Sequence, residues 1–267
     1  MHNKLLLFFV ILSSSVRAEI ARQDSLRKPR IDKPYFLSYY YDTRDVIVSP
    51  LHPTKRRLIS YGVAATALGI AFSQDANIQR FSQDHRTSRT DWASDYVLGP
   101  LGRGDYSMSL LTLVYASGAI FHNDNSKRIA LLGIKTYFVS ALIARAPKYG
   151  LSRARPSVGD GPNHWFAGWG NNSFVSGHTT VAFSIATIIA LEYRKTVWVP
   201  MLAYATAAVC GYSRINANKH WASDVTGGAL LGYGIASLIY RQDNWGVYIV
   251  PDLRSSGNGM SLIIPLR

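Results

Sequence analysis

Apolar stretches separated by short polar linkers dominate the middle of this 267-residue chain. They are rich in Ala, Leu, Ile and Gly, and their length and spacing favour buried helices rather than strands. The pattern predicts helices over residues 57–73, 106–122, 128–145, 178–193, 197–212 and 224–240. We therefore expect an all-α fold, a compact bundle of about six core helices.

The segments that flank this bundle have different patterns. Residues 19–55 are polar, aromatic and contain proline, which predicts an extended N-terminal segment with little regular helix. After Gln242 the apolar residues alternate, in WGVYIVPDL and MSLIIPL around the turn-rich SSGNG, which predicts a C-terminal β-hairpin. The expected organisation is a leader (1–18), an extended segment (19–55), a helical domain (56–242) and a hairpin tail (243–267).

The leader resembles a secretory signal peptide. Lys4 precedes a short apolar stretch, Leu5 to Leu12, and Val-Arg-Ala ends at Ala18 as a small-residue cleavage pattern. The apolar stretch is too short for a comfortable membrane span, so we expect cleavage near Ala18, with an uncleaved anchor as the alternative. We expect the protein to be exported to the periplasm and to lie with its basic face against a membrane. The alternative is an integral membrane protein whose polar loops at 146–176 and 213–223 face the periplasm.

Composition limits the class of partner. Hydrophobic residues make up 48% and charged residues 17% of the chain, which excludes an intrinsically disordered protein. The formal net charge of +13 favours anionic partners such as phosphate esters or anionic lipid. The sequence contains no nucleic-acid-binding motif, so nucleic acid is not an expected partner. Cys210 is the only cysteine, which excludes an internal disulfide and indicates a buried structural thiol.

Three polar segments carry the candidate chemistry. Residues 148–156 read KYGLSRARP, residues 176–178 read SGH, and residues 213–224 read SRINANKHWASD. Taken singly, they are compatible with a solvated basic loop, a helix-capping histidine and an ordinary helix-surface pair. All three in this order rarely arise by chance. Together they indicate a site.

The set resembles the signature of the phosphatidic acid phosphatase type 2 / vanadium haloperoxidase superfamily. That signature is Lys-x6-Arg-Pro, then Pro-Ser-Gly-His, then Ser-Arg-x5-His-x3-Asp; this chain departs from it only at Val175, where the family usually has proline. The resemblance runs from about the first apolar stretch to Tyr240. It implies an acid phosphatase/haloperoxidase-like helical bundle.

Cations and a helix start predict a phosphate site. Two arginines can bind phosphoryl oxygens bidentately, a lysine adds a third cation, and a serine adds a hydroxyl. Backbone N–H groups at a helix N-terminus favour phosphate, and a glycine there lets the ligand approach closely. The predicted phosphate-binding residues are Lys148, Arg155, Ser176, Gly177 and Arg214.

The resemblance assigns the catalytic roles. It implies that His220 attacks phosphorus, that Asp224 holds the His220 ring, and that His178 protonates the leaving alkoxide. The expected function is a metal-independent phosphatase acting on phosphomonoesters or diphosphates, lipid-linked, through a phosphohistidine. We expect no cofactor and no metal site, because three nearby cations would repel a divalent ion.

Two alternatives use the same anion site. One is a vanadate-dependent haloperoxidase, although haloperoxidases of the family are longer chains with extra helices. The other is a non-catalytic phosphate-binding envelope protein, against which the pairing of His220 with Asp224 argues.

Two residue pairs near the motifs are open to two interpretations. His164 and Trp165 either line the substrate entrance or belong to a packed loop, and we expect the packed loop. Asn171 and Asn172 are expected to be turn residues rather than ligands.

Overall fold

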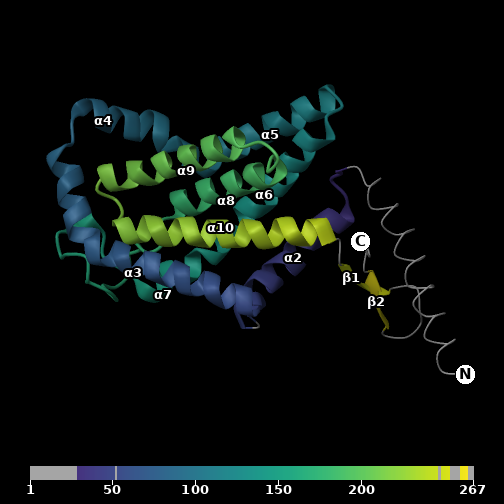
Figure 1. Ribbon diagram of the computed structural model, residues 1–267, viewed down its shortest axis with the longest axis horizontal. Helices are drawn as coiled ribbons and strands as arrows, with labels where there is room; N and C mark the ends of the chain where they lie inside the picture. The colour runs from purple at the N-terminus through teal and green to yellow at the C-terminus, as the bar shows by residue number, and fades with distance from the viewer. Residues whose placement is uncertain (1–28, 52, 246–247, 253–258, 264–267) are drawn as a thin grey trace, which may run out of the picture.

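The computed structural model describes residues 29–51, 53–245, 248–252 and 259–263, and most of its helices follow one long axis (Figure 1). The α-helices are α2 (Lys33–Val48), α3 (Lys55–Asp84), α4 (Ser88–Trp92), α5 (Gly104–Ile120), α6 (Asp124–Ile143), α7 (Arg145–Leu151), α8 (Gly177–Glu192), α9 (Trp198–Asn216) and α10 (Ala222–Trp245). A π-helical turn (Ala93–Leu98) and 3-10 turns at Ser49–Leu51, Pro100–Gly102 and Pro156–Val158 interrupt the connections.

The helices predicted from the apolar stretches are all present, as α3, α5, α6, α8, α9 and α10. The expected number of about six is too low, because α2, α4 and α7 come in addition. These helices are rich in polar and aromatic residues. A search for apolar stretches therefore does not find them.

The prediction of an extended segment over 19–55 is wrong for Lys33–Val48, which forms α2. Its proline falls in the first helical turn, where a missing N–H costs nothing. The Asp32 side chain caps this helix by accepting a hydrogen bond from the Tyr35 amide at 3.0 Å. Further along α2, Asp42 pairs with the buried Lys135 ammonium of α6 at 2.7 Å. A capped start and a buried ion pair thus hold α2 on the bundle.

Helix α3 extends beyond its predicted end at residue 73 and continues to Asp84. The extension is polar, but it contacts the chain that leaves α9. Gln83 donates hydrogen bonds to the Ile215 and Asn216 carbonyls at 3.2 Å, and Gln79 donates to Asn218. In the packed contact these bonds take the place of hydrogen bonds to water. The polar side chains of α3 can therefore pack here without an apolar face.

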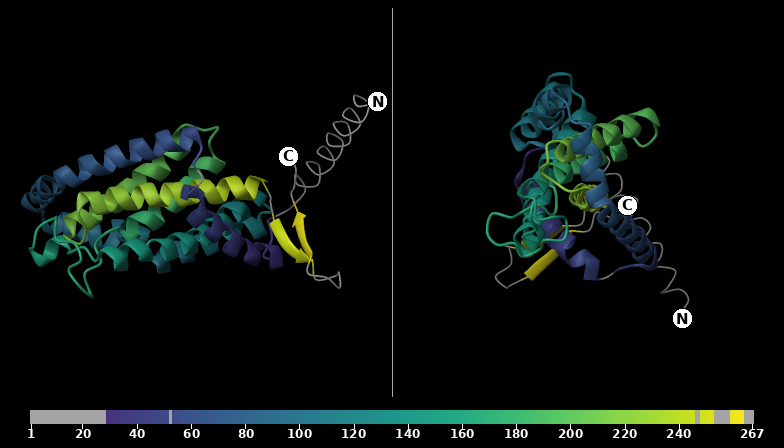
Figure 2. Two further views of the ribbon diagram at one scale, coloured as in Figure 1. Left: turned by 90° about the horizontal axis from the view of Figure 1, so that it is seen from below. Right: turned by 90° about the vertical axis from the view of Figure 1, so that its left-hand side faces the viewer.

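Helix α8 lies at the centre of the bundle and packs against α6, α9 and α10. Its last turns contribute to a core whose buried members are Val46, Leu132, Val139, Ile188, Ile235, Ala236, Ile239 and Tyr240. The strands β1 (Tyr248–Asp252) and β2 (Gly259–Ile263) lie beyond the end of α10 (Figure 2).

The two strands pair antiparallel, with Tyr248 opposite Ile263 and Asp252 opposite Gly259. Residues 253–258, which connect them, lie outside the described residues, so the hairpin tail over 243–267 stays a prediction. The leader expected at 1–18 also lies outside the described residues.

Helices α8 and α10 approach each other closely because α10 presents glycines to α8. A Cβ placed on Gly232 would lie 2.3 Å from the Thr180 carbonyl oxygen and 3.0 Å from the Ser184 nitrogen. Both are backbone atoms of α8, which cannot rotate away as a side chain does. Gly234, two residues on, has no heavy atom within 4 Å of its Cβ position.

We expect Gly232→Ala to lower the free energy of unfolding by about 1–3 kcal/mol, because α8 must move to accommodate the methyl group. Gly234→Ala is the matched control and should be neutral or stabilising by up to about 1 kcal/mol through helix propensity. Thermal unfolding followed by circular dichroism measures both. Equal stability of the two variants would contradict the close contact.

Candidate active site

The three motif segments converge at the end of the bundle where α6 finishes and α8 and α10 begin (Figure 1). The first lies on α7 and the extended chain after it, and the second on the first turn of α8. The third runs from the last turn of α9 to the first turn of α10. Segments that are far apart in sequence therefore meet at one end.

A cavity of about 460 Å³ opens at this end. Of the predicted site residues, Lys148, Arg155, Gly177 and His178 line it. Among the lining residues that the sequence did not assign to the site are Arg103, Arg145 and Asn172, and one acidic residue, Asp105, which pairs with Arg103 at 2.6 Å. The cavity is therefore strongly cationic, as an anion site requires.

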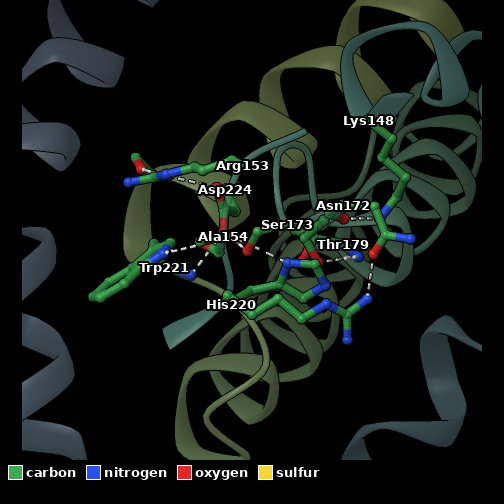
Figure 3. Close-up of polar contacts among 12 residues, drawn as sticks. Lys148, Arg153, Ala154, Asn172, Ser173, Thr179, His220, Trp221 and Asp224 are labelled. Carbon is green, nitrogen blue, oxygen red and sulfur yellow. Dashed lines mark hydrogen bonds and ion pairs between the residues drawn. The ribbon is translucent and has the colours of Figure 1, made fainter. Parts of the chain in front are cut away.

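Asn172 holds two of the cations. The Lys148 Nζ donates to its backbone carbonyl at 2.9 Å, and the Arg155 guanidinium donates to its Oδ1 at 2.7 Å (Figure 3). The prediction that Asn172 is only a turn residue is therefore incomplete. Asn171 bonds to the Ala167 carbonyl at 2.7 Å, which is typical of a turn residue.

Ser176, which is fully buried, is the N-cap residue of α8. Its Oγ accepts hydrogen bonds from the Thr179 amide at 3.5 Å and the Thr179 hydroxyl at 2.9 Å. The Ser176 hydroxyl thus acts as a helix cap, and its contact with phosphate stays a prediction. Gly177 lies beside Lys148, whose Cε would be 3.6 Å from an added Cβ.

Asp224 is the most heavily hydrogen-bonded predicted residue, and it is fully buried. Its carboxylate accepts from the Arg153 guanidinium at 2.6 Å, the Ser173 hydroxyl at 2.5 Å and the Trp221 amide at 2.8 Å (Figure 3). These donors satisfy both oxygens, which allows the charge to be buried. The carboxylate is thereby fixed in one orientation.

His220 lies beside this carboxylate and is 4% exposed. Its Nδ1 is 3.6 Å from Asp224 Oδ2, which is an ion-pair distance but longer than a hydrogen bond. Burial lowers the pKa of His220, and the charges of Lys148 and Arg155 act in the same direction, whereas Asp224 opposes them. The free site therefore favours a neutral imidazole.

Arg214 is buried in the last turn of α9, under the chain that precedes α5. An added Cβ on Gly99 would lie 2.8 Å from its Nη2, and one on Gly102 would lie 2.7 Å from the His178 Cβ. The segment 93–103 therefore covers both residues closely. No pattern in the sequence assigned it to the site.

Arg153 lies in the first motif but is not among the predicted site residues. It is fully buried and does not belong to a solvated basic loop. Besides Asp224 it binds Asp75 of α3 at 2.7 Å, and the Trp165 ring lies 4.6 Å from its guanidinium carbon. Trp165 thus belongs to a packed loop, as expected. Its neighbour His164 is exposed and pairs with Asp160.

Cys210 is fully buried, as predicted for a structural thiol. Burial in apolar surroundings disfavours the charged thiolate. Among the described residues, no group of three or more His, Cys, Asp or Glu side chains is placed to hold a metal ion.

The motif-bearing region is similar to proteins of a known family. Residues 129–247 match the model of the PAP2 superfamily. A lipid A 1-phosphatase of Porphyromonas gingivalis is 37% identical over 132 residues, which cover 46% of this chain and 27% of that protein. An undecaprenyl-diphosphatase of Sulfolobus acidocaldarius is 25% identical over 122 residues, 45% of this chain and 58% of that one.

The chain therefore spans between about a quarter and three fifths of the length of these relatives. Among solved structures, a transmembrane PAP2 type phosphatidylglycerolphosphate phosphatase from Bacillus subtilis is similar with a TM-score of 0.52 at 21% identity. That similarity covers 80% of this chain and 97% of the other. It shows that the two chains share a fold.

The pKa of Lys148 makes anion binding sensitive to pH. Burial and the adjacent charge of Arg155 lower this pKa to about 8. The ammonium is charged below this pH and neutral above it, so we expect the affinity for inorganic phosphate to fall as pH rises through about 8. Titration calorimetry between pH 7 and 9 measures the change.

Lys148→Met is the control for the pH dependence of phosphate itself. It should bind phosphate more weakly at pH 7 and show a flatter profile between pH 7 and 9. An unchanged profile in this variant would contradict the assignment to Lys148.

Proposed function

We propose that this protein is a metal-independent phosphatase that cleaves lipid-linked phosphomonoesters or diphosphates through a phosphohistidine. One observation carries the proposal: the buried pair His220–Asp224 lies behind a cavity lined by Lys148, Arg155 and His178. Cations alone would suffice to bind phosphate. A buried histidine beside a fixed carboxylate is the arrangement of an activated nucleophile.

The chemistry follows from these positions. The Asp224 carboxylate faces Nδ1 of His220, which leaves Nε2 as the nucleophilic atom. Nε2 forms a bond to phosphorus while the P–O bond to the leaving group breaks, and His178 donates a proton to the departing oxygen. Water then attacks the phosphohistidine with His178 as base, releasing phosphate and free His220.

The charged groups stabilise this reaction in two ways. The cations Lys148, Arg155 and Arg214 stabilise the negative equatorial oxygens of the transition state. Asp224 stabilises the positive charge that develops on the His220 ring during attack. No step uses a metal ion, and the cationic cavity would repel one.

A lipid-linked substrate is supported by an apolar groove and by the relatives. The groove has a volume of about 490 Å³ and lies between α5, α8 and α9. Its wall includes Leu101 and Tyr106, and the residues between them, 102–105, line the cationic cavity. One short segment thus separates a space for an apolar group from a space for phosphate. The relatives named for lipid A and undecaprenyl diphosphate act on substrates of this amphipathic kind.

Substitution of the nucleophile tests the function. We expect His220→Ala to abolish phosphate release, a loss of at least about 10⁴-fold. Asp224→Asn should cost less, about 10²–10³-fold, because the nucleophile remains. Phosphate release from a panel of lipid and water-soluble phosphates, measured in the presence of a chelator, gives the rates. His164→Ala changes an exposed histidine and is the matched control.

Several outcomes would contradict the proposal. Near-normal turnover by His220→Ala would exclude the phosphohistidine, and a requirement for an added divalent metal would exclude metal independence. Bromide oxidation by peroxide in the presence of vanadate, without phosphate release, would favour the haloperoxidase. Phosphate binding without turnover of any substrate would favour a binding protein.

We also propose that the bundle is embedded in lipid with the active end at the membrane surface. Apolar side chains are exposed along three helices, namely Leu58, Ile59, Val63 and Ile70 of α3, Leu110, Leu113 and Ile120 of α5, and Trp198, Met201 and Leu202 of α9. So much exposed apolar surface is rare in a water-soluble monomer. Among the residues that the structure describes, one stretch, Asp124–Val158, is by length and composition apolar enough to span, with 56% of its most apolar window buried. Exposed aromatic residues at the active end, such as Trp169 and Tyr149, suit a lipid–water interface.

Membrane fractionation distinguishes this location from the peripheral one expected from the leader. We expect the protein to stay in the membrane after carbonate and salt washes and to need detergent for extraction. Release by carbonate would instead support a periplasmic domain resting on the membrane. N-terminal sequencing of the purified chain shows separately whether cleavage occurs near Ala18.

A further inference from the structure

A buried ion cluster lies behind the candidate active site, on the side away from the cavity. Arg153 is fully buried between two aspartates that are also fully buried, Asp224 of α10 and Asp75 of α3. One guanidinium nitrogen donates to Asp224 at 2.6 Å and the other to Asp75 at 2.7 Å. The cluster therefore has two carboxylates for one cation.

Asp75 is tied to the start of α10 as well as to Arg153. Its Oδ1 accepts from the Ser223 amide at 2.8 Å, and its Oδ2 accepts from the Ser223 hydroxyl at 2.6 Å. Every one of these partners donates to an Asp75 oxygen, which is the environment of a carboxylate rather than of a carboxylic acid. Asp75 thus contributes a negative charge next to Asp224 without touching the cavity.

We propose that Asp75 is a positioning residue that keeps the negative charge of Asp224 available to His220 by sharing Arg153. The inference rests on the proposed function, because it assigns Asp75 a part in the reaction of His220. Two carboxylates and one guanidinium sum to a net charge of −1. The cluster can then balance the positive charge that His220 acquires on protonation or during attack on phosphorus.

Removal of Asp75 would change that balance. Arg153 would face only Asp224, the pair would be neutral, and the buried positive charge on His220 would lose its counter-charge. The other charged or titratable groups around His220 are Lys148 of α7, Arg155 of the following chain, His178 of α8 and Asp224 of α10. Of these, only Asp224 opposes a positive charge on the ring. Loss of the second carboxylate, Asp75, should therefore have a measurable effect on the pKa of His220.

Removal of the charge of Asp75 and removal of the charge of Arg153 should shift the pKa of His220 in opposite directions. Asp75→Asn should lower the pKa of His220 by about 0.5–1 unit, because the cluster becomes neutral. Arg153→Met should raise this pKa by a similar amount, because the cluster then carries −2. The double variant restores a charge of −1 and should return the pKa toward the wild-type value. A structural role alone has no reason to produce shifts of opposite sign.

The test measures the His220 ring directly. Proteins with isotope-labelled histidine are titrated by NMR, and the His220 signal is assigned by its loss in His220→Gln. Two controls accompany the charge variants. Ser223→Ala removes a hydrogen bond from the same network without changing its charge, and Asp84→Asn makes the same charge change at an exposed site on α3. Neither should move the pKa of His220.

Kinetics provide a second measurement. Asp75→Asn should lower kcat about 10-fold with little change in KM, and the acid limb of its pH–rate profile should move to lower pH. For Arg153→Met the acid limb should move to higher pH. Because the two signs are opposite, either variant tests the proposal if the other fails to fold.

A His220 pKa that stays at its wild-type value in a folded charge variant would overturn the proposal. So would shifts of the same sign in Asp75→Asn, Arg153→Met and Ser223→Ala, which would indicate a structural role. The NMR titration does not depend on turnover. Absence of phosphatase activity in the wild-type protein would therefore count against the proposed function, and the charge-sharing result would stand or fall separately.

Discussion

The buried carboxylate of Asp224 is the contact on which the candidate site depends. It accepts hydrogen bonds from Arg153, which belongs to the first motif, from Ser173, which precedes the second, and from Trp221 within the third. Its backbone carbonyl also accepts from the Ser176 amide at 3.0 Å. A carboxylate can be buried only if donors surround it. Burial of this one charge is therefore favourable only when all three segments meet.

Helix packing makes that meeting possible. A Cβ on Gly228 of α10 would lie 2.7 Å from the Ser176 carbonyl oxygen, so the glycine permits the first turns of α8 and α10 to approach. The same closeness allows the Ser176 amide to reach Asp224. The core further along α8 and α10, including Ile188 and Ile235, keeps the two helices packed against each other. Apolar packing in the bundle thus determines the geometry of the polar end.

The sequence predicted those features that depend on local pattern. Helices with apolar faces and motifs with characteristic spacing, such as His220 and Asp224 four residues apart, can be found from the order of residues alone. Asp75 and Asn172 could not be found in this way, because their partners lie far away in sequence and their neighbours carry no characteristic spacing. Helix α2 was missed for a related reason. A cap and a buried Lys135–Asp42 pair hold it on the bundle together with Val46 in the core, and its sequence is too polar to be read as an apolar stretch.

The arrangement of charge explains why the candidate site suits a dianionic group. Lys148 and Arg155 are held on one residue, Asn172, and their proximity lowers the pKa of the lysine. Their mutual repulsion raises the free energy of the empty cavity, and an anion between them removes it. The negative cluster of Asp75, Arg153 and Asp224 lies on the opposite side of His220, away from the cavity. In the proposed mechanism, His220 therefore stands between a region that would attract phosphate and a region that would stabilise the positive charge created when the ring attacks phosphorus.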